Sequence, residues 1–181
     1  DLALLYISDG DNWKYDALMQ EGIEKGVADC FAWGMEHEDI WEALPAERRK
    51  ELHERMAANM LKGIELGGSF CAYLLAYSKF EGSFGFKKDL EGALTAAQKG
   101  VAMHSHLCCN MVLDIMSLEY LRNEIPEDKI LSDEEVCLMY LKSARYGDDS
   151  KIETILECED YVNLGYGEEM KELAHWHRMK A

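Results

Sequence analysis

The hydrophobic positions of this sequence recur at helical spacing over most of its length. β-Branched residues are sparse and never alternate with polar residues over a run long enough for a strand, so the pattern does not favour a β-sheet. Single glycines interrupt the helical stretches, and a new helical pattern follows each interruption after a few residues. The sequence therefore predicts an all-α, almost wholly helical protein.

Four of these helical stretches resemble one another, and each is expected to close on a glycine. They are ALMQEGIEKGVADC (17–30), ANMLKGIELGGSFC (58–71), ALTAAQKGVAMH (93–104) and YLKSARYGDDSK (140–151). The anchoring glycines are Gly26, Gly67, Gly100 and Gly147, separated by 41, 33 and 47 residues. Glycine after the last helical turn can adopt the left-handed conformation that ends a helix. Each unit is thus predicted to be a helix, a turn, a second helix and a glycine.

The turns and helix starts within the units carry recognisable signals. Pro45 stands where a long helix can begin, and Gly82 and Gly85 break the helix that precedes them. Asp89 is placed to cap the next helix. The run SDEE from Ser132 to Glu135 is a capping box after a polar loop.

A helical pair of this size cannot bury its apolar face alone, whereas stacked neighbours can, which favours a solenoid. We expect one helical-repeat domain over residues 1–181 with about four units. The expected boundaries are 1–26, 27–67, 68–100, 101–147 and 148–181. The chain begins without methionine and inside an apolar pattern, so we expect further residues before the first unit.

One unit carries a family resemblance. In residues 67–100, Leu75 and Ala76 precede the turn at Gly82. The segment after the turn carries the other positions of the repeat, which are Lys88, Asp89, Ala93, Ala96, Ala97, Lys99 and Gly100. This arrangement resembles the Sel-one-like repeat, a relative of the tetratricopeptide repeat. The resemblance implies a right-handed α-α superhelix that binds proteins or assembles complexes and has no catalytic activity. Some bacterial members of that family are immunity proteins that neutralise secreted toxins.

Charge and composition narrow the range of partners. The net charge is -16, from 35 acidic and 19 basic residues. Such a surface repels nucleic-acid phosphates and anionic membranes and favours a basic protein. No uninterrupted apolar run approaches the roughly 18 residues of a membrane-spanning helix. The six cysteines show no disulfide-framework spacing, which favours the cytoplasm. The alternative is the periplasm, if a signal peptide has been removed.

The stretch VAMHSHLCCNMV (101–112) is the strongest candidate for metal or redox chemistry. A helix through it would place His104 and Cys108 on one apolar stripe and His106 and Cys109 on the other side. Four such ligands cannot converge on one tetrahedral zinc ion. Counting from the anchoring glycines places His104 in the same packing position as Cys30 and Cys71. We therefore predict no metal and no cofactor, with a metal site at His104 and Cys108 as a remote alternative.

The remaining motifs do not indicate an enzyme. The chain has no H-E-x-x-H zinc helix, no G-x-S-x-G nucleophile turn and no phosphate-binding glycine loop. The adjacent carboxylates Glu168 and Glu169 follow one another on a helix and are not a spatial acid and base pair.

The prediction is instead a binding face built from the first helices of the units. Solenoids use such extended faces for binding, and tyrosine is a common interface anchor. Positions six and ten after each anchoring glycine, together with a nearby aspartate, are expected to form it. The candidate partner-binding residues are Glu36, Tyr73, Tyr77, His106, Asn110, Asp114, Glu153 and Glu157.

Three functions remain open from the sequence. The first is a protein-binding module whose acidic and aromatic face holds a basic protein partner. The second is an immunity protein that neutralises a cognate toxin. The third is the metal-binding alternative.

Overall fold

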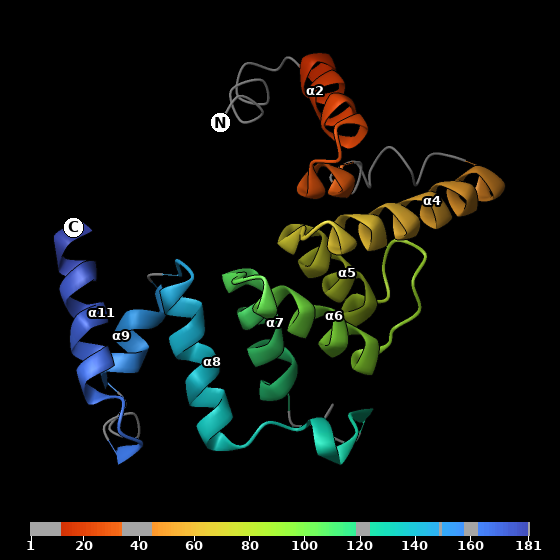
Figure 1. Cartoon of the computed structure of the whole chain (residues 1–181). Helices are drawn as coiled ribbons and strands as arrows, with labels where there is room; N and C mark the ends of the chain where they lie inside the picture. The colour runs from red at the N-terminus through yellow and green to blue at the C-terminus, as the bar shows by residue number, and fades with distance from the viewer. Residues whose placement is uncertain (1–11, 34–44, 119–123, 149, 158–162, 181) are drawn as a thin grey trace.

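A computed structural model describes residues 12–33, 45–118, 124–148, 150–157 and 163–180, and Figure 1 shows that they form helices and connecting turns. These residues contain eight α-helices, two short 3₁₀ helices and no strand. The α-helices are α2 (Asn12–Glu24), α4 (Ala46–Glu65), α5 (Ser69–Glu81), α6 (Leu90–Ala102), α7 (His106–Ser117), α8 (Asp133–Arg145), α9 (Ser150–Glu157) and α11 (Gly167–Lys180). The 3₁₀ helices are η1 (Ala28–Ala32) and η4 (Glu127–Lys129). The prediction of an all-α chain is confirmed for the described residues.

The helices pack in the order of the chain. Along the curved row in Figure 1, α4 contacts α5, α5 contacts α6, and this continues through α7, α8 and α9. Alternate elements also meet, because α5 contacts η1 on one side and α7 on the other. The packing therefore brings η1, α5 and α7 together as a second set of neighbours.

Four helices end in the same hydrogen-bonded turn. The amide groups of Val27, Gly68, Ser105 and Asp148 donate to the carbonyl oxygens of Gly22, Gly63, Gly100 and Ser143, at 2.8, 2.8, 3.0 and 3.1 Å. The residue before each donor has a positive φ: Gly26 (73°), Gly67 (89°), His104 (61°) and Gly147 (113°). This pattern is the Schellman motif. It recurs at spacings of 41, 37 and 43 residues.

The third of these turns corrects the predicted register. Gly100 was expected to end its helix, but α6 continues to Ala102 and the left-handed residue is His104. Gly100 is instead equivalent to Gly22 and Gly63, which lie inside their helices. The boundary expected at Gly100 therefore lies four residues too early.

These internal glycines allow a close approach between successive helices. A Cβ atom added to Gly22, Gly63 or Gly100 would lie 2.3, 2.4 or 2.1 Å from the Sγ atom of Cys30, Cys71 or Cys108, respectively. The residue equivalent to Cys30 and Cys71 is therefore Cys108, and the assignment of His104 to that position was wrong. Cys71 and Cys108 are both fully buried, as this contact requires.

The local signals around the helices are confirmed. Pro45 precedes α4, and the side chain of Asp89 accepts a hydrogen bond from the amide of Gly92 at 2.8 Å. Ser132 and Glu135 form both halves of the capping box at the start of α8. Gly82 ends α5 with a φ of 74°, and Gly85 has a φ of 78°.

The main core extends from α4 to α8. Met60, Leu94 and Ile115 are among its largest fully buried side chains. Ala72 of α5 and Ala97 of α6 are also fully buried, and such small side chains allow the backbones of paired helices to lie close together. A smaller cluster around Leu141, Ile152 and Ile155 joins α8 to α9.

Candidate functional site

Four of the predicted binding residues line one cavity between α5 and α7. The cavity has a volume of about 300 Å³. Helix α5 contributes Tyr73, Tyr77, Phe80 and Glu81. Helix α7 contributes Leu107, Asn110, Met111 and Asp114. We call this the α5/α7 cavity.

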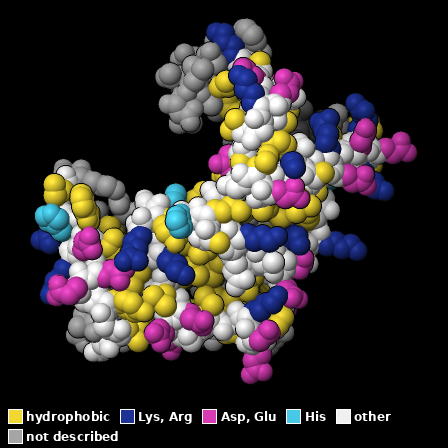
Figure 2. Space-filling model, in the orientation of Figure 1, with side chains coloured by type: hydrophobic (Ala, Val, Ile, Leu, Met, Phe, Trp, Pro, Cys, Tyr) yellow, Lys and Arg dark blue, Asp and Glu magenta, His cyan; other side chains and the backbone are white. Residues whose placement is uncertain are grey.

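Aromatic rings form the α5 side of this cavity. The rings of Tyr73 and Tyr77 have centroids 6.3 Å apart and are tilted by 32°, and Phe70 stacks on Tyr73 at 6.1 Å. Tyr73 is half-buried, whereas the side chain of Tyr77 is 38% exposed. Figure 2 shows hydrophobic side chains gathered over the middle of the molecule, with Asp and Glu side chains around the edge of this face.

The charge of the α5/α7 cavity is wholly negative. Glu81 and Asp114 are its charged lining residues, and neither forms an ion pair within the described part of the chain. Burial raises the pKa of Tyr73, and the neighbouring Tyr77 and Asp114 raise it further. Tyr73 therefore keeps its proton at neutral pH. The cavity combines neutral aromatic faces with two unpaired carboxylates.

Asn110 also has a structural role inside the protein. Its amide nitrogen donates to the carboxylate of Asp148 at 2.7 Å, and its amide oxygen accepts from the buried hydroxyl of Ser143 at 2.8 Å. Ser150 donates to the same carboxylate through its amide and its hydroxyl, at 3.1 and 2.5 Å. The polar group of Asn110 therefore joins α7 to the turn between α8 and α9.

The corrected register explains the position of His106. Because Cys108 is equivalent to Cys71, Asn110 and Asp114 are equivalent to Tyr73 and Tyr77. His106 begins α7, is half-buried and does not line the α5/α7 cavity. Among the other predicted residues, Glu36 lies outside the described residues, and so do the side chains of Glu153 and Glu157.

The geometry assumed for His104 and Cys108 as metal ligands is not present. His104 lies in the turn before α7, where its exposed ring stacks on Tyr146 with centroids 4.8 Å apart. Cys108 is fully buried, and its thiol lies 3.7 Å from the carbonyl oxygen of Ser69. In the described ranges, no group of three or more His, Cys, Asp or Glu residues is placed to hold a metal ion.

Burial also makes the thiols poor nucleophiles. It raises the pKa of Cys71 and Cys109 to about 12, with smaller increases from Asp29 and Cys30 for Cys71 and from Cys108 for Cys109. Burial raises the pKa of Cys108 as well, and this effect outweighs a hydrogen bond with Ser105 that lowers the pKa. Since the thiolate is the reactive form, these cysteines serve packing in the folded protein.

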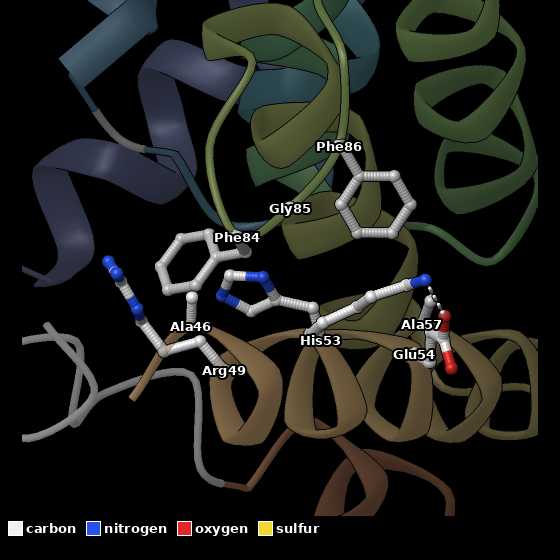
Figure 3. Close-up of a pocket in the computed structure, with 9 residues that line it drawn as sticks. Ala46, Arg49, His53, Glu54, Ala57, Phe84, Gly85 and Phe86 are labelled. Carbon is white, nitrogen blue, oxygen red and sulfur yellow. Dashed lines mark ion pairs between the residues drawn. The ribbon is translucent and has the colours of Figure 1, made fainter. Parts of the chain in front are cut away.

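Sequence reasoning missed a larger cavity between α4 and the loop that follows α5 (Figure 3). Its volume is about 460 Å³, and we call it the α4/loop cavity. Helix α4 contributes one face, from Ala46 through Arg49, Lys50, His53 and Glu54 to Ala57. Phe84, Gly85 and Phe86 of the loop form the opposite wall. The available signal was a group of basic residues on α4 in a strongly acidic chain.

The loop of this cavity is a strained turn. The amide of Phe86 donates to the carbonyl oxygen of Ser83 at 3.0 Å, and both central residues have positive φ, 51° for Phe84 and 78° for Gly85. This is the pattern of a type I′ turn, which favours Asn followed by Gly. The left-handed conformation costs a residue with a Cβ atom roughly 1–2 kcal/mol. Phe84 is therefore held in a conformation that its own preferences oppose.

Comparison of the chain with family models, with curated proteins and with solved structures returned no match. None of the described helices is both long and apolar enough to cross a membrane.

Proposed function

We propose that this protein is a non-enzymatic helical-repeat module of the Sel-one-like kind, which binds a basic protein through the surface formed by α5 and α7. In this proposal the repeats form a right-handed solenoid. A lysine or arginine side chain of the partner enters the α5/α7 cavity. The observation that carries the proposal is that one cavity combines aromatic rings with carboxylates that form no ion pair, and that no basic side chain lines it, as far as the described residues go.

The chemistry of the cavity matches a lysine or arginine side chain, in which a positive charge stands at the end of an apolar stem. The faces of Tyr73 and Tyr77 attract a positive charge by cation–π interaction, and the methylene groups of lysine or arginine can pack on Leu107 and Met111. Asp114 and Glu81 supply the negative charge. The overall charge of -16 would also speed the approach of a basic partner.

The repeated turns support the repeat part of the proposal. The same pair of hydrogen-bonding positions closes α2, α4, α6 and α8, and the glycine-to-cysteine approach recurs at three of these junctions. A repeating junction is what allows similar units to stack on one another. The fourth junction has Ser143 and Lys151 in these positions, so the repeat changes toward the carboxyl end.

A defined peptide tests the binding proposal. The probe is a fluorescently labelled arginine-rich peptide, and the control peptide carries citrulline, the uncharged analogue, at each arginine. We expect the whole chain to bind the arginine peptide more tightly than the citrulline peptide, with both affinities measured by fluorescence anisotropy. The variant Tyr77→Ala should weaken binding roughly 2- to 30-fold, the range of a cation–π contact worth about 0.5–2 kcal/mol.

Charge variants separate the contribution of the cavity to binding from that of the protein's overall negative charge. Asp114→Asn should weaken binding of the arginine peptide, whereas Glu127→Gln, an exposed carboxylate on η4, should leave it nearly unchanged. Equal weakening by both variants would mean that net charge alone attracts the peptide. Equal binding of the arginine and citrulline peptides would overturn the proposal.

A further inference from the structure

The α4/loop cavity differs in charge from the rest of the molecule. Three of its lining residues are basic types, Arg49, Lys50 and His53, although the whole chain has a net charge of -16. Lys50 lies 3.9 Å from the carboxylate of Glu54, which is the one acidic residue among the described residues that line the cavity. This pairing leaves Arg49 as the unbalanced charge of the cavity.

Arg49 lacks a partner inside the described structure. Its Nε atom is buried and has no hydrogen-bond acceptor, and its guanidinium group forms no ion pair with a described residue. Buried polar groups in proteins are almost always hydrogen-bonded, so Arg49 can take an acceptor that the described residues do not supply. A carboxylate is the acceptor whose geometry matches a guanidinium group, since it can accept two parallel hydrogen bonds.

The opposite wall of the cavity is apolar and is held in place by the strained turn. Figure 3 shows the imidazole of His53 below Gly85, with the rings of Phe84 and Phe86 on either side and Arg49 toward the Phe84 side. A Cβ atom at Gly85 would lie 2.4 Å from Nδ1 of His53, so this close contact requires glycine. The turn therefore directs two phenylalanines toward α4 against the conformational preference of Phe84. Strain of this kind is concentrated at binding sites.

We propose that the α4/loop cavity binds an acidic peptide segment in which a carboxylate stands next to an apolar side chain. The carboxylate pairs with Arg49, and the apolar side chain packs on the ring of Phe84, on the side of His53 where Arg49 lies. Ala46 and Ala57 mark the ends of the α4 face, where their small side chains leave room. A volume of about 460 Å³ falls within the ~300–1,000 Å³ of pockets that enclose small ligands, which suits two adjacent side chains.

This site is independent of the proposed function. It lies on α4 and the loop after α5, and it shares no lining residue with the α5/α7 cavity. The two cavities also have opposite charge preferences, because none of the described residues that line the first is basic, whereas the second contains Arg49, which has no ion-pair partner among the described residues. One protein could therefore hold a basic and an acidic segment at the same time.

Binding of short labelled peptides to the whole chain tests this inference. The probe is a labelled hexapeptide, Gly-Ser-Phe-Glu-Gly-Ser, with an amidated carboxyl end, and binding is measured by fluorescence anisotropy. One control peptide replaces its glutamate with glutamine, and another replaces its phenylalanine with alanine. We expect saturable binding of the probe and at least fivefold weaker binding of each control.

Matched protein variants assign the binding to the cavity. Arg49→Met keeps much of the apolar stem but removes the charge, and should weaken binding of the probe at least tenfold. Arg48→Met removes a neighbouring exposed charge that pairs with Glu51 outside the cavity, and should have little effect. Phe84→Asn suits the type I′ turn better than phenylalanine does, so it should retain the thermal stability of the protein while weakening binding.

Several results would overturn the inference. They are an absence of saturable binding, equal binding of the glutamate and glutamine peptides, and equal affinity of the Arg49→Met and wild-type proteins. Equal affinity for free 3-phenylpropionate would overturn the assignment to a peptide, because it would show a site for small apolar acids. Loss of arginine-peptide binding at the α5/α7 cavity would not affect the outcome.

Discussion

The α-carbon of Gly100 lies so close to Cys108 that a Cβ atom on the glycine would be 2.1 Å from the cysteine Sγ atom. The same relationship joins Gly63 to Cys71 and Gly22 to Cys30, at 2.4 and 2.3 Å. Each pair joins the end of one helix to the start of the following helical segment. A glycine and a buried thiol are thus the two halves of a recurring helix junction.

Replacing Gly100 with alanine should destabilise the protein. The added methyl group would collide with Cys108 and would also come within 3.2 Å of the Cβ atom of Ala72. We expect a loss of about 1–3 kcal/mol in the free energy of unfolding from overpacking, even though alanine favours the helix by roughly 1 kcal/mol. Urea unfolding followed by circular dichroism measures the change.

A second substitution separates this collision from other causes. Cys108→Ala removes the sulfur, so the double variant Gly100→Ala/Cys108→Ala should be more stable than the sum of the single effects predicts. Gly147→Ala is the contrasting case, because its φ is 113° and nothing lies within 4 Å of its added Cβ atom. Its loss of stability should be independent of Cys108.

The variant His104→Gly should be more stable than the variant His104→Ala. Its φ of 61° is unfavourable for any residue with a Cβ atom, and three equivalent turns have glycine there. Both substitutions remove the stacking of His104 on Tyr146, so their difference isolates the backbone conformation. We expect His104→Gly to exceed His104→Ala in unfolding free energy by about 1 kcal/mol. Equal stability of the two variants would contradict the left-handed turn.

Asp148 should make the folded protein sensitive to acid. Burial raises the pKa of its carboxyl, but hydrogen bonds from Ser150 and Asn110 and the charge of Lys151 outweigh burial and lower the pKa overall. A lowered folded pKa stabilises the protein above the unfolded value of about 3.9. That contribution is lost as the pH falls through the folded pKa.

The variant Asp148→Asn measures this contribution. At pH 7 it should be less stable than the wild type by about 1–3 kcal/mol, because the hydrogen bonds to the charged carboxylate are weakened. The difference should shrink in urea unfolding at pH 3. A difference that stays constant from pH 7 to pH 3 would exclude the titration of Asp148 as the cause.

The buried thiols should be unreactive in the folded protein. The pKa of Cys71 and Cys109 is raised to about 12 by burial, so almost no thiolate is present at neutral pH. We expect iodoacetamide to leave both residues unlabelled under native conditions and to label them after denaturation, as measured by peptide mass spectrometry. The half-buried Cys30 serves as the internal comparison and should react earlier. Rapid native labelling of Cys109 would contradict the packing of α7.

Features that depend on near neighbours in the chain could be predicted from the sequence. The cap at Asp89, the capping box from Ser132 to Glu135 and the helix end at Gly82 were all predicted correctly. The reason is that their hydrogen bonds join residues three or four positions apart. Helical spacing also placed Tyr73 and Tyr77 on one face of α5, whereas their meeting with Asp114 of α7 depends on how the two helices pack.

The register of the third unit required the tertiary structure. Glycine is used both where φ must be positive and where another helix comes close, and the sequence does not distinguish the two uses. Gly100 serves the second use and His104 occupies the left-handed position, a position that histidine rarely adopts. The error at Gly100 displaced the predicted face of α7 by four residues and included His106 in it.

The sequence by itself determined the helical composition, the helix boundaries at the caps and the strong negative charge of this protein. The tertiary structure decided which glycines meet a thiol, which residues share a cavity, and that Arg49 and Phe84 line the same α4/loop cavity. The physical reason is the range of the interactions. Helix and turn preferences act over a few residues, whereas cavities and close contacts depend on how distant segments pack.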